Sequence, residues 1–357
     1  MDVQQQVSQS SQDFTAPGAV TVRPFLLKPQ WLNGLSEQLV VRHYVDHYGR
    51  ALRRLNAIRA RLASVDGTHA SAFANADLKR EELTTATSVM LHEIYFESLG
   101  GYGDNPPTGN EEPPAELAQA LERDFGSVAA WRANFAAMGK ALADGSGWVM
   151  LAWSQRLGRL VNHSAVDDAH GLPAATPILV IDMYEHAYSA DFGGDAAAYV
   201  DQVMANLNWE RVAARYRLAI GEAADDKLFV PYGAPAQEEA RMSVEELKAA
   251  LEADEARRPL LLDVCLPRDL RRRTDMLAGA TMHAPAALPR WVADLPRSRP
   301  IAVYCICGFQ VSGKTVTELR QRGYDARAVV GGITAWHAIG GPTVPMDLST
   351  YEKDGVG

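Results

Sequence analysis

The feature that most constrains the fold is an apolar run, Pro177–Ile181, that ends directly at an acid. A short apolar run of this kind predicts a buried strand. Asp182 then stands at the end of the strand, and His186 follows four residues later, where the chain is expected to turn into a helix. A carboxylate and an imidazole so placed can direct oxygen and nitrogen to one point, as a first-row transition metal requires. Taken alone, such a pair is more often a surface acid and a hydrogen-bonded histidine.

Length and composition bound the class of protein. The 357 residues suffice for two or three domains, and 47% hydrophobic with 22% charged residues is typical of globular proteins. The net charge of −9, with no basic block, argues against nucleic-acid binding. We expect no membrane span, because the chain lacks an apolar stretch of about 18 residues, and no signal peptide, because the first residues have neither a basic region nor an apolar core. The three cysteines all lie in the last third, which fits a cytoplasmic protein with a working thiol.

Changes in periodicity divide the chain into six segments. We expect a disordered tail rich in Gln and Ser, a helical-hairpin subdomain, a small α/β subdomain, a linker, an α/β domain with a parallel sheet, and a C-terminal tail. The expected bounds are 1–21, 22–103, 104–220, 221–241, 242–347 and 348–357.

Within the first two subdomains, the pattern predicts helices followed by strands and a last helix, an α+β arrangement. Two long helices form the hairpin, and Asp77 is the expected N-cap of the second. The expected helices are 36–63, 77–101, 115–124, 127–143 and 196–218, and the expected strands are 147–153, 159–163 and 178–182.

In the C-terminal domain, strands alternate with helices, which predicts a parallel sheet. The expected strands are 259–264, 300–304 and 326–330, and the expected helices are 243–253, 315–322 and one around Ala335.

The hairpin carries further histidines that can complete a metal site. His43 and His92 lie one on each helix, and with Asp182 and His186 they offer three imidazoles and one carboxylate. This donor set suits iron, manganese or zinc and leaves a fifth position for water or a small anion. Iron and manganese also change oxidation state, so redox chemistry becomes possible.

Four separated motifs resemble the iron/manganese superoxide dismutase family, in the order that the family has them. They are the first helix LSEQLVVRHYVDHY, the second helix LHEIYFESL, the strand start GSGW that ends at Trp148, and the C-terminal signature DMYEHAYSADF with YVDQVMANLNWERVAARY. The resemblance covers about residues 22–218. It implies metal ligands at His43, His92, Asp182 and His186, with one iron or manganese ion per chain. It implies that one superoxide is oxidised to oxygen by M(III) and a second is reduced to peroxide by M(II).

The resemblance also implies a homodimer. The family's Glu at the position of Glu185 reaches across the dimer to the partner's ligand histidine, which orients that ligand. Tyr188 would belong to the same interface. The alternative for Glu185 is a solvated acid at a helix N-terminus, stabilised by the helix dipole.

Around the metal, the sequence departs from the family pattern. Tyr184 replaces the usual Trp, and Ala51 replaces the gateway Tyr that feeds protons to peroxide. His47 matches the channel histidine, and Tyr48 beside it is a candidate for the missing phenol. The metal-tuning Gln is absent, since Ser88 stands at the iron-type position. In the loop of the manganese-type position, our candidate is His170; a two-residue slip in the loop and a free surface histidine are the alternatives.

A second candidate site lies in the C-terminal domain. Cys305 follows an expected strand and precedes a helix, where backbone N–H groups and the helix dipole favour a thiolate and can hold a persulfide or an anion. From the local sequence, a small apolar cysteine at a strand end is an equal alternative.

The segments LLLDV, AGATMHAP, YCICGFQVS and GGITAW resemble the rhodanese domain over about 242–345. The resemblance implies a persulfide on Cys305, exchanged with a sulfur donor or thiol acceptor. Cys265 stands where the family usually has Arg, and the active loop has no cation, so we expect poor binding of thiosulfate. Cys307 is a candidate to resolve an oxidised Cys305, although the C-x-C spacing is strained. Zinc binding by the three cysteines and nucleotide binding by the P-loop-like Gly308–Thr315 are weaker alternatives.

The sequence thus predicts a cytoplasmic dismutase fused to a rhodanese-like domain, dimeric through the dismutase part. The alternatives are a sulfurtransferase or redox sensor whose dismutase part is weakly active or only binds metal, and a binding protein without turnover at either site.

Overall fold

The structure is a computed structural model that describes residues 18–64, 72–101, 105–109, 111–142, 145–254 and 258–354. These residues pack into two compact units. One unit is Leu26–Phe229, and the other combines the N-terminal segment up to Phe25 with the chain from Val230 onwards. Most of the expected N-terminal tail, residues 1–17, lies outside the described part of the chain.

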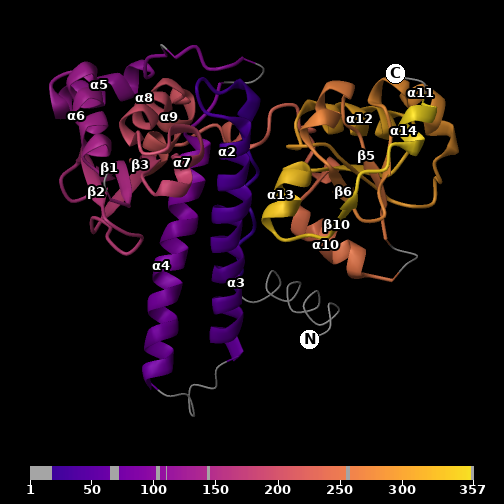
Figure 1. The fold of residues 1–357 in the computed structure, drawn as a ribbon, viewed down its shortest axis with the longest axis horizontal. Helices are drawn as coiled ribbons and strands as arrows, with labels where there is room; N and C mark the ends of the chain where they lie inside the picture. Colours follow the sequence, from indigo (N-terminus) through magenta and orange to yellow (C-terminus); the bar gives the residue numbers. More distant parts are fainter. Residues whose placement is uncertain are drawn as a thin grey trace. The chain divides into compact units, whose positions relative to one another are not determined.

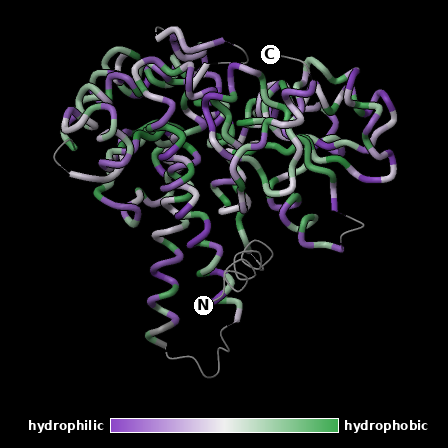
Figure 2. Tube along the Cα trace, turned by 45° about the vertical axis from the view of Figure 1, so that its right-hand side comes forward, coloured by the Kyte–Doolittle hydropathy of each residue, from purple (hydrophilic) through white to green (hydrophobic). Residues whose placement is uncertain are grey.

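The first unit begins with the predicted helical hairpin. After a short 3-10 helix, η1 (Pro29–Trp31), its first arm is α2 (Glu37–Arg42), the π-helical turn η2 (His43–Tyr48) and α3 (Gly49–Ser64), and its second arm is α4 (Ala72–Glu97). Figure 1 shows α3 and α4 side by side, and Figure 2 shows hydrophobic residues between hydrophilic ones along both.

The ends of the hairpin helices follow local chemistry. The Ser36 side chain caps α2 by accepting a hydrogen bond from Leu39 N at 3.1 Å, as its place before the apolar positions predicts. The prediction that Asp77 caps the second helix is wrong. Asp77 lies inside α4, where its carboxylate pairs with Arg80 one turn later at 3.0 Å. No described helix has both the length and the apolar character to cross a bilayer.

A small α/β part completes the first unit. Its strands form an antiparallel sheet in the order β2-β1-β3, in which Trp148 lies opposite Asp182. The elements are α5 (Ala115–Phe125), α6 (Val128–Ala141), β1 (Trp148–Ser154), β2 (Arg159–Ala165), β3 (Ala175–Asp182), η3 (Glu185–Ala187), α7 (Ser189–Phe192), α8 (Ala196–Ala205), α9 (Trp209–Ala219) and η4 (Asp226–Phe229).

The single helix predicted over 196–218 is two helices, α8 and α9. The chain breaks between them because the Asn208 side chain accepts a hydrogen bond from Arg211 N at 3.1 Å and so starts a new helix. Arg211 itself is buried, and its guanidinium donates to the backbone carbonyls of Leu26, Leu99 and Leu228. The Arg211 side chain therefore connects the first residues of the unit, the segment after the hairpin and the last 3-10 helix of the unit.

The second unit contains the predicted parallel sheet, with five short strands in the order β4-β9-β8-β5-β7. Strands β10 and β6 form a separate antiparallel pair. The strands are β4 (Arg241–Met242), β5 (Leu260–Asp263), β6 (Asp275–Leu277), β7 (Thr281–Met282), β8 (Ile301–Tyr304), β9 (Ala326–Val329) and β10 (Thr343–Pro345). The helices are η5 (Glu238–Ala240), α10 (Val244–Glu252), η7 (Pro267–Arg272), η8 (Pro285–Ala287), α11 (Leu288–Trp291), η9 (Val292–Asp294), α12 (Gln310–Gln321), α13 (Gly332–Ala338) and α14 (Ser349–Lys353).

Helix α12 begins at Gln310, five residues before the predicted start at Thr315. Gly313, Lys314 and Thr315 are therefore inside the helix and do not form a phosphate-binding loop. Gly313 is needed for packing instead, since a Cβ there would lie 2.0 Å from the carbonyl oxygen of Gly233.

The described residues of the expected C-terminal tail, 348–354, are packed. Tyr351 in α14 is buried, and its hydroxyl donates to the carbonyl of Cys265 at 3.2 Å. The Asp354 carboxylate accepts a hydrogen bond from Ala284 N at 2.8 Å. Tyr351 holds this segment in place because its ring buries apolar surface while its hydroxyl keeps a hydrogen bond.

Candidate metal centre

Four side chains predicted as ligands meet in the first unit. His43 comes from the π-helical turn η2, His92 from α4, Asp182 from the last position of β3, and His186 from η3. One ligand atom from each lies within 4.8 Å of all the others. A π-helical turn inside a long helix is frequent at functional sites, because it rotates a side chain out of the regular α-helical positions.

The Asp182 carboxylate lies at the centre of this group. Its Oδ2 atom is 3.0 Å from His43 Nε2, 3.2 Å from His186 Nε2 and 3.5 Å from His92 Nε2. The other oxygen, Oδ1, accepts a hydrogen bond from Tyr184 N at 2.8 Å. The backbone therefore fixes the carboxylate, and Oδ2 is left facing the three imidazoles.

Burial sets the charges in this group. It lowers the pKa of His92 to about 3 and also lowers the pKa of His43. Burial by itself would raise the pKa of Asp182, but hydrogen bonds from His186 and His43 outweigh it and hold the pKa well below its usual range. At neutral pH the group thus offers a carboxylate and, at His43 and His92, neutral imidazoles, which is the protonation state that metal binding requires.

The His92 imidazole offers a lone pair to a metal ion. His92 Nδ1 lies 2.8 Å from the carbonyl oxygen of Ser88, which can only accept, so Nδ1 carries the proton and Nε2 has a free lone pair. Nε2 is buried and has no hydrogen-bond partner among the described residues. A buried polar atom without a partner costs about 1–3 kcal/mol. The three imidazoles and the carboxylate have the donor types and spacing to hold one iron or manganese ion.

Aromatic side chains surround the four residues. The Trp148 ring packs edge-on against His92 with centroids 5.1 Å apart, and the Tyr184 ring stacks on His186 at 5.6 Å. The His47 ring also stacks on His186, with centroids 3.8 Å apart. Trp148, Tyr184 and His47 thus all pack directly against histidines of the group.

The loop after β2 differs from the prediction. His170 is exposed and pairs with Asp167 at 2.6 Å, so it does not line the metal centre. The residue that reaches inward is Asp168, whose Oδ1 accepts a hydrogen bond from Trp148 Nε1 at 2.8 Å. This is the two-residue slip considered above. Burial raises the pKa of Asp168. Sequence reasoning missed it because the choice depends on the loop's path.

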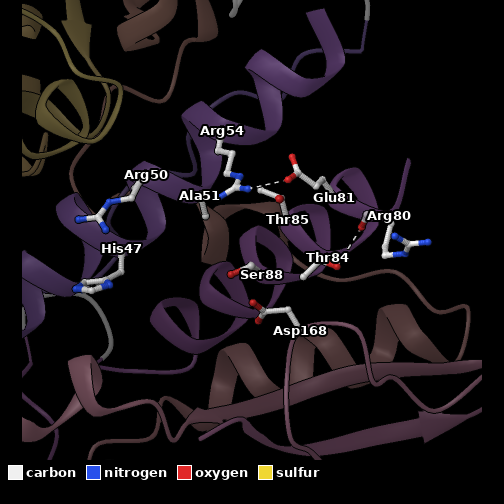
Figure 3. A pocket seen from close by; sticks show the side chains of 10 residues that line it. All are labelled: His47, Arg50, Ala51, Arg54, Arg80, Glu81, Thr84, Thr85, Ser88 and Asp168. Carbon is white, nitrogen blue, oxygen red and sulfur yellow. Dashed lines mark hydrogen bonds and ion pairs between the residues drawn. The ribbon is translucent and has the colours of Figure 1, made fainter. Parts of the chain in front are cut away.

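A pocket of about 400 Å³ adjoins the centre between α3 and α4 (Figure 3). His47 and Ala51 line it on one side and Ser88 and Asp168 on the other. Tyr48 does not replace the phenol missing at Ala51, since its ring is buried and its hydroxyl donates to Glu93 at 3.0 Å.

The two residues expected at a dimer interface differ in exposure. Glu185 is exposed, whereas Tyr188 is buried within the chain and packs against Tyr199 with centroids 5.5 Å apart.

In the second unit, Cys305 directly follows β8 and precedes α12. Its thiol is buried and lies 3.5 Å from Ser312 Oγ. The Cys307 thiol has a different neighbour, Thr334 Oγ1 at 3.6 Å, and none of the three cysteines forms a disulfide bond. The four residues of the metal centre are the single group of three or more His, Cys, Asp or Glu ligands in the described part of the chain, so a zinc site at the cysteines gains no support.

Comparison with known proteins agrees with the geometry of the first unit. Residues 113–215 match the family model for the C-terminal domain of iron/manganese superoxide dismutases. A protein named superoxide dismutase [Fe] from Cupriavidus metallidurans is 50% identical over 199 residues, which are 56% of this chain and 97% of the relative. A superoxide dismutase [Fe] from Aquifex pyrophilus is 33% identical, over 54% of this chain and 90% of the relative. A superoxide dismutase [Mn] from Halobacterium salinarum is 32% identical, over 51% and 86%. Over the part of the chain that these relatives share, the protein belongs to the iron/manganese superoxide dismutase family.

Proposed function

We propose that the first unit is a superoxide dismutase that holds one iron or manganese ion per chain at His43, His92, Asp182 and His186. The observation that carries the proposal is the buried, unpartnered Nε2 atom of His92, directed at the Asp182 carboxylate. The relatives that cover this unit are named as iron and as manganese enzymes, which supports either metal.

The bound ion would supply a one-electron couple, and the chain's own residues prepare the site for it. Asp182 is fixed by Tyr184 N, and Ser88 fixes the tautomer of His92. Trp148 and Tyr184 pack their rings against His92 and His186. Ala51 carries no hydroxyl and the Tyr48 hydroxyl is bound to Glu93, so we expect proton delivery, and with it turnover, to be slower than in enzymes that keep the gateway phenol.

The test is metal analysis of the purified full chain, paired with dismutase assays of the iron-loaded and manganese-loaded forms. We expect about one ion per chain and activity well above that of free metal. His92→Ala should lose both the ion and the activity. The matched control is His170→Ala, which removes an exposed imidazole and should change neither. A metal-replete chain that is no faster than free metal would disprove the proposal.

We further propose that Glu185 orients a ligand histidine of a second copy, which makes the protein a homodimer. Its exposure is compatible with this role, since a side chain that reaches a partner must be free of its own chain.

A second activity is favoured by the position of Cys305. We infer that residues 242–347 form a rhodanese-like domain, joined to dismutase subdomains at 22–103 and 104–220 by the linker 221–241. Ligands of parallel α/β sheets bind at the carboxyl ends of the strands, and Cys305 stands at such an end. Gly332 permits this loop, because a Cβ there would lie 2.2 Å from the Cys305 carbonyl oxygen. The Cys305 sulfur would attack the outer sulfur of a persulfide donor (R–S–SH), so that its new S–S bond forms as the donor's S–S bond breaks and the donor thiolate leaves. An acceptor thiolate would then attack the outer sulfur of the Cys305 persulfide and release the Cys305 thiolate.

To test the second activity, the full chain is treated with a sulfur donor and alkylated, and bound sulfur is located by mass spectrometry. We expect one additional sulfur on Cys305, none in Cys305→Ser, and an unchanged yield in the matched variant Cys307→Ser. Equal sulfur on wild type and Cys305→Ser would refute it.

A further inference from the structure

The pocket beside the metal centre is larger than the dismutase reaction needs. Its volume, about 400 Å³, is within the roughly 300–1,000 Å³ range of small-molecule sites. A water molecule occupies about 30 Å³ in the liquid. Superoxide has only two atoms, so the pocket has room for a molecule several times larger.

The pocket lining has more basic than acidic side chains, although the chain carries a net charge of −9: Arg50, Arg54 and Arg80 against Glu81 and Asp168. Helix α3 contains five arginines and no carboxylate, and two of these arginines, Arg50 and Arg54, line the pocket one helical turn apart. Arg50 makes no ion pair with the carboxylates that the structure describes. Arg54 pairs with Glu81 at 3.1 Å, but both side chains are more than half exposed, and such pairs contribute only about 0–1 kcal/mol. An incoming anion can therefore replace Glu81.

The interior of the pocket is open because of Ala51. Its side chain ends at Cβ, and below it Figure 3 shows Ser88 and Asp168 pointing toward each other across the floor. His47 forms the adjoining wall, with its ring stacked on the ligand candidate His186. A molecule held in the pocket would thus lie next to the outer side of the metal centre.

We propose that this pocket binds a small organic dianion, a dicarboxylate whose two carboxylates are held by Arg50 and Arg54 above the opening left by Ala51. Arginine binds carboxylates through paired, charge-assisted hydrogen bonds. Side chains four residues apart on a helix have Cβ atoms about 6 Å apart, a span that flexible arginines can adapt to a four-carbon diacid. The bound dianion covers the approach past His47.

The test is isothermal titration of the metal-loaded full chain with succinate, at an ionic strength held constant with chloride. We expect one saturable site per chain. Arg50→Gln and Arg54→Gln should each raise the Kd about tenfold or more, as expected for a lost charge-assisted hydrogen bond. Ala51→Tyr should abolish binding because the phenol fills the opening. Arg61→Gln is the matched control: it removes the same charge from the exposed surface of the same helix, outside the pocket, and should leave the Kd unchanged.

Three results would overturn the proposal: no saturable heat, an Arg61→Gln effect as large as that of Arg50→Gln, or inorganic phosphate binding as tightly as succinate. Circular dichroism and metal content of each variant establish that it is folded. Succinate should also lower kcat/KM for superoxide, and only this readout rests on the proposed dismutase function. A chain that binds succinate but has no dismutase activity would disprove that function and leave the binding site standing.

Discussion

The imidazole rings of His47 and His186 lie parallel, with centroids 3.8 Å apart and an angle of 7° between their planes. His47 is four residues beyond His43 on the same arm of the hairpin, so the π-helical turn presents both histidines to the metal centre. Burial lowers the pKa of His47 to about 4, and electrostatic repulsion from the nearby His186 is the next largest cause. The ring is therefore neutral at pH 7 and acts on His186 by packing.

Removing the His47 ring should loosen the metal without abolishing binding. We expect His47→Ala to weaken metal affinity by about two- to tenfold, the worth of one aromatic pair. His47→Phe keeps a stacked ring and should remain close to wild type. The measurement is metal transfer to a chromogenic chelator at pH 7. Equal losses in the two variants would mean that the imidazole nitrogens, rather than stacking, are what matters.

Asp168 should stabilise the metal centre through Trp148. In Asp168→Ala the buried indole N–H loses its acceptor, which costs about 1–3 kcal/mol, whereas Asp168→Asn retains an oxygen acceptor. We expect a lower thermal midpoint and altered tryptophan fluorescence for the alanine variant only. Asp167→Ala, one residue away with a half-exposed side chain, is the control. The role fails if Asp168→Asn is as unstable as Asp168→Ala.

Glu185 should control the oligomeric state. We expect the wild type to sediment as a dimer and Glu185→Ala to dissociate at higher protein concentration, because a charge-assisted hydrogen bond is lost. Glu210→Ala removes another exposed acid of the same unit and should not change sedimentation. A wild type that is monomeric at all concentrations would contradict the dimer.

Glu245 should make stability depend on pH in the second unit. Its Oε1 accepts from Val22 N at 2.7 Å, but its buried Oε2 has no partner among the described residues, and burial raises its pKa. A carboxyl whose pKa is raised in the folded state costs stability above that pKa, and this cost disappears as pH falls toward the unfolded value. Glu245→Gln should thus melt at a higher temperature than wild type at pH 7.5, and the difference should shrink as pH falls toward 4.5. A constant difference over this range would exclude titration of Glu245 as the cause.

Gly332 should be required for the Cys305 loop. It has φ +56°, and a Cβ would lie 2.2 Å from the Cys305 carbonyl oxygen, so Gly332→Ala should cost about 2 kcal/mol or more. Gly279 also has a positive φ, +81°, but a Cβ there meets nothing within 4 Å. Gly279→Ala should therefore cost only the backbone term, about 1–2 kcal/mol. Thermal midpoints of the two variants separate steric overlap from backbone strain, and equal midpoints would exclude the overlap.

Much of the metal centre could be predicted from the sequence. Periodicity predicted the hairpin helices, which carry His43 and His92, and the strand that ends at Asp182. A hydrophobic pattern predicts such elements because their buried faces repeat at a fixed spacing. The π-helical turn at His43 and the 3-10 helix at His186 depart from that regular pattern, and the fold decided the directions of these two side chains. The alternation of strands and helices likewise predicted the parallel sheet before Cys305.

The tertiary structure determined the positions of side chains outside the regular helices and strands. The loop after β2 could present His170 or Asp168, and only its three-dimensional path placed Asp168 against Trp148. From the sequence, Ala51 indicated only the loss of the gateway tyrosine. In the structure, its small side chain lines a pocket between α3 and α4. Local sequence carries little information on such contacts, because they join residues far apart in the chain and depend on loops whose conformation is set by packing. The four candidate ligands could thus be named from the sequence, whereas the fold determined their surroundings.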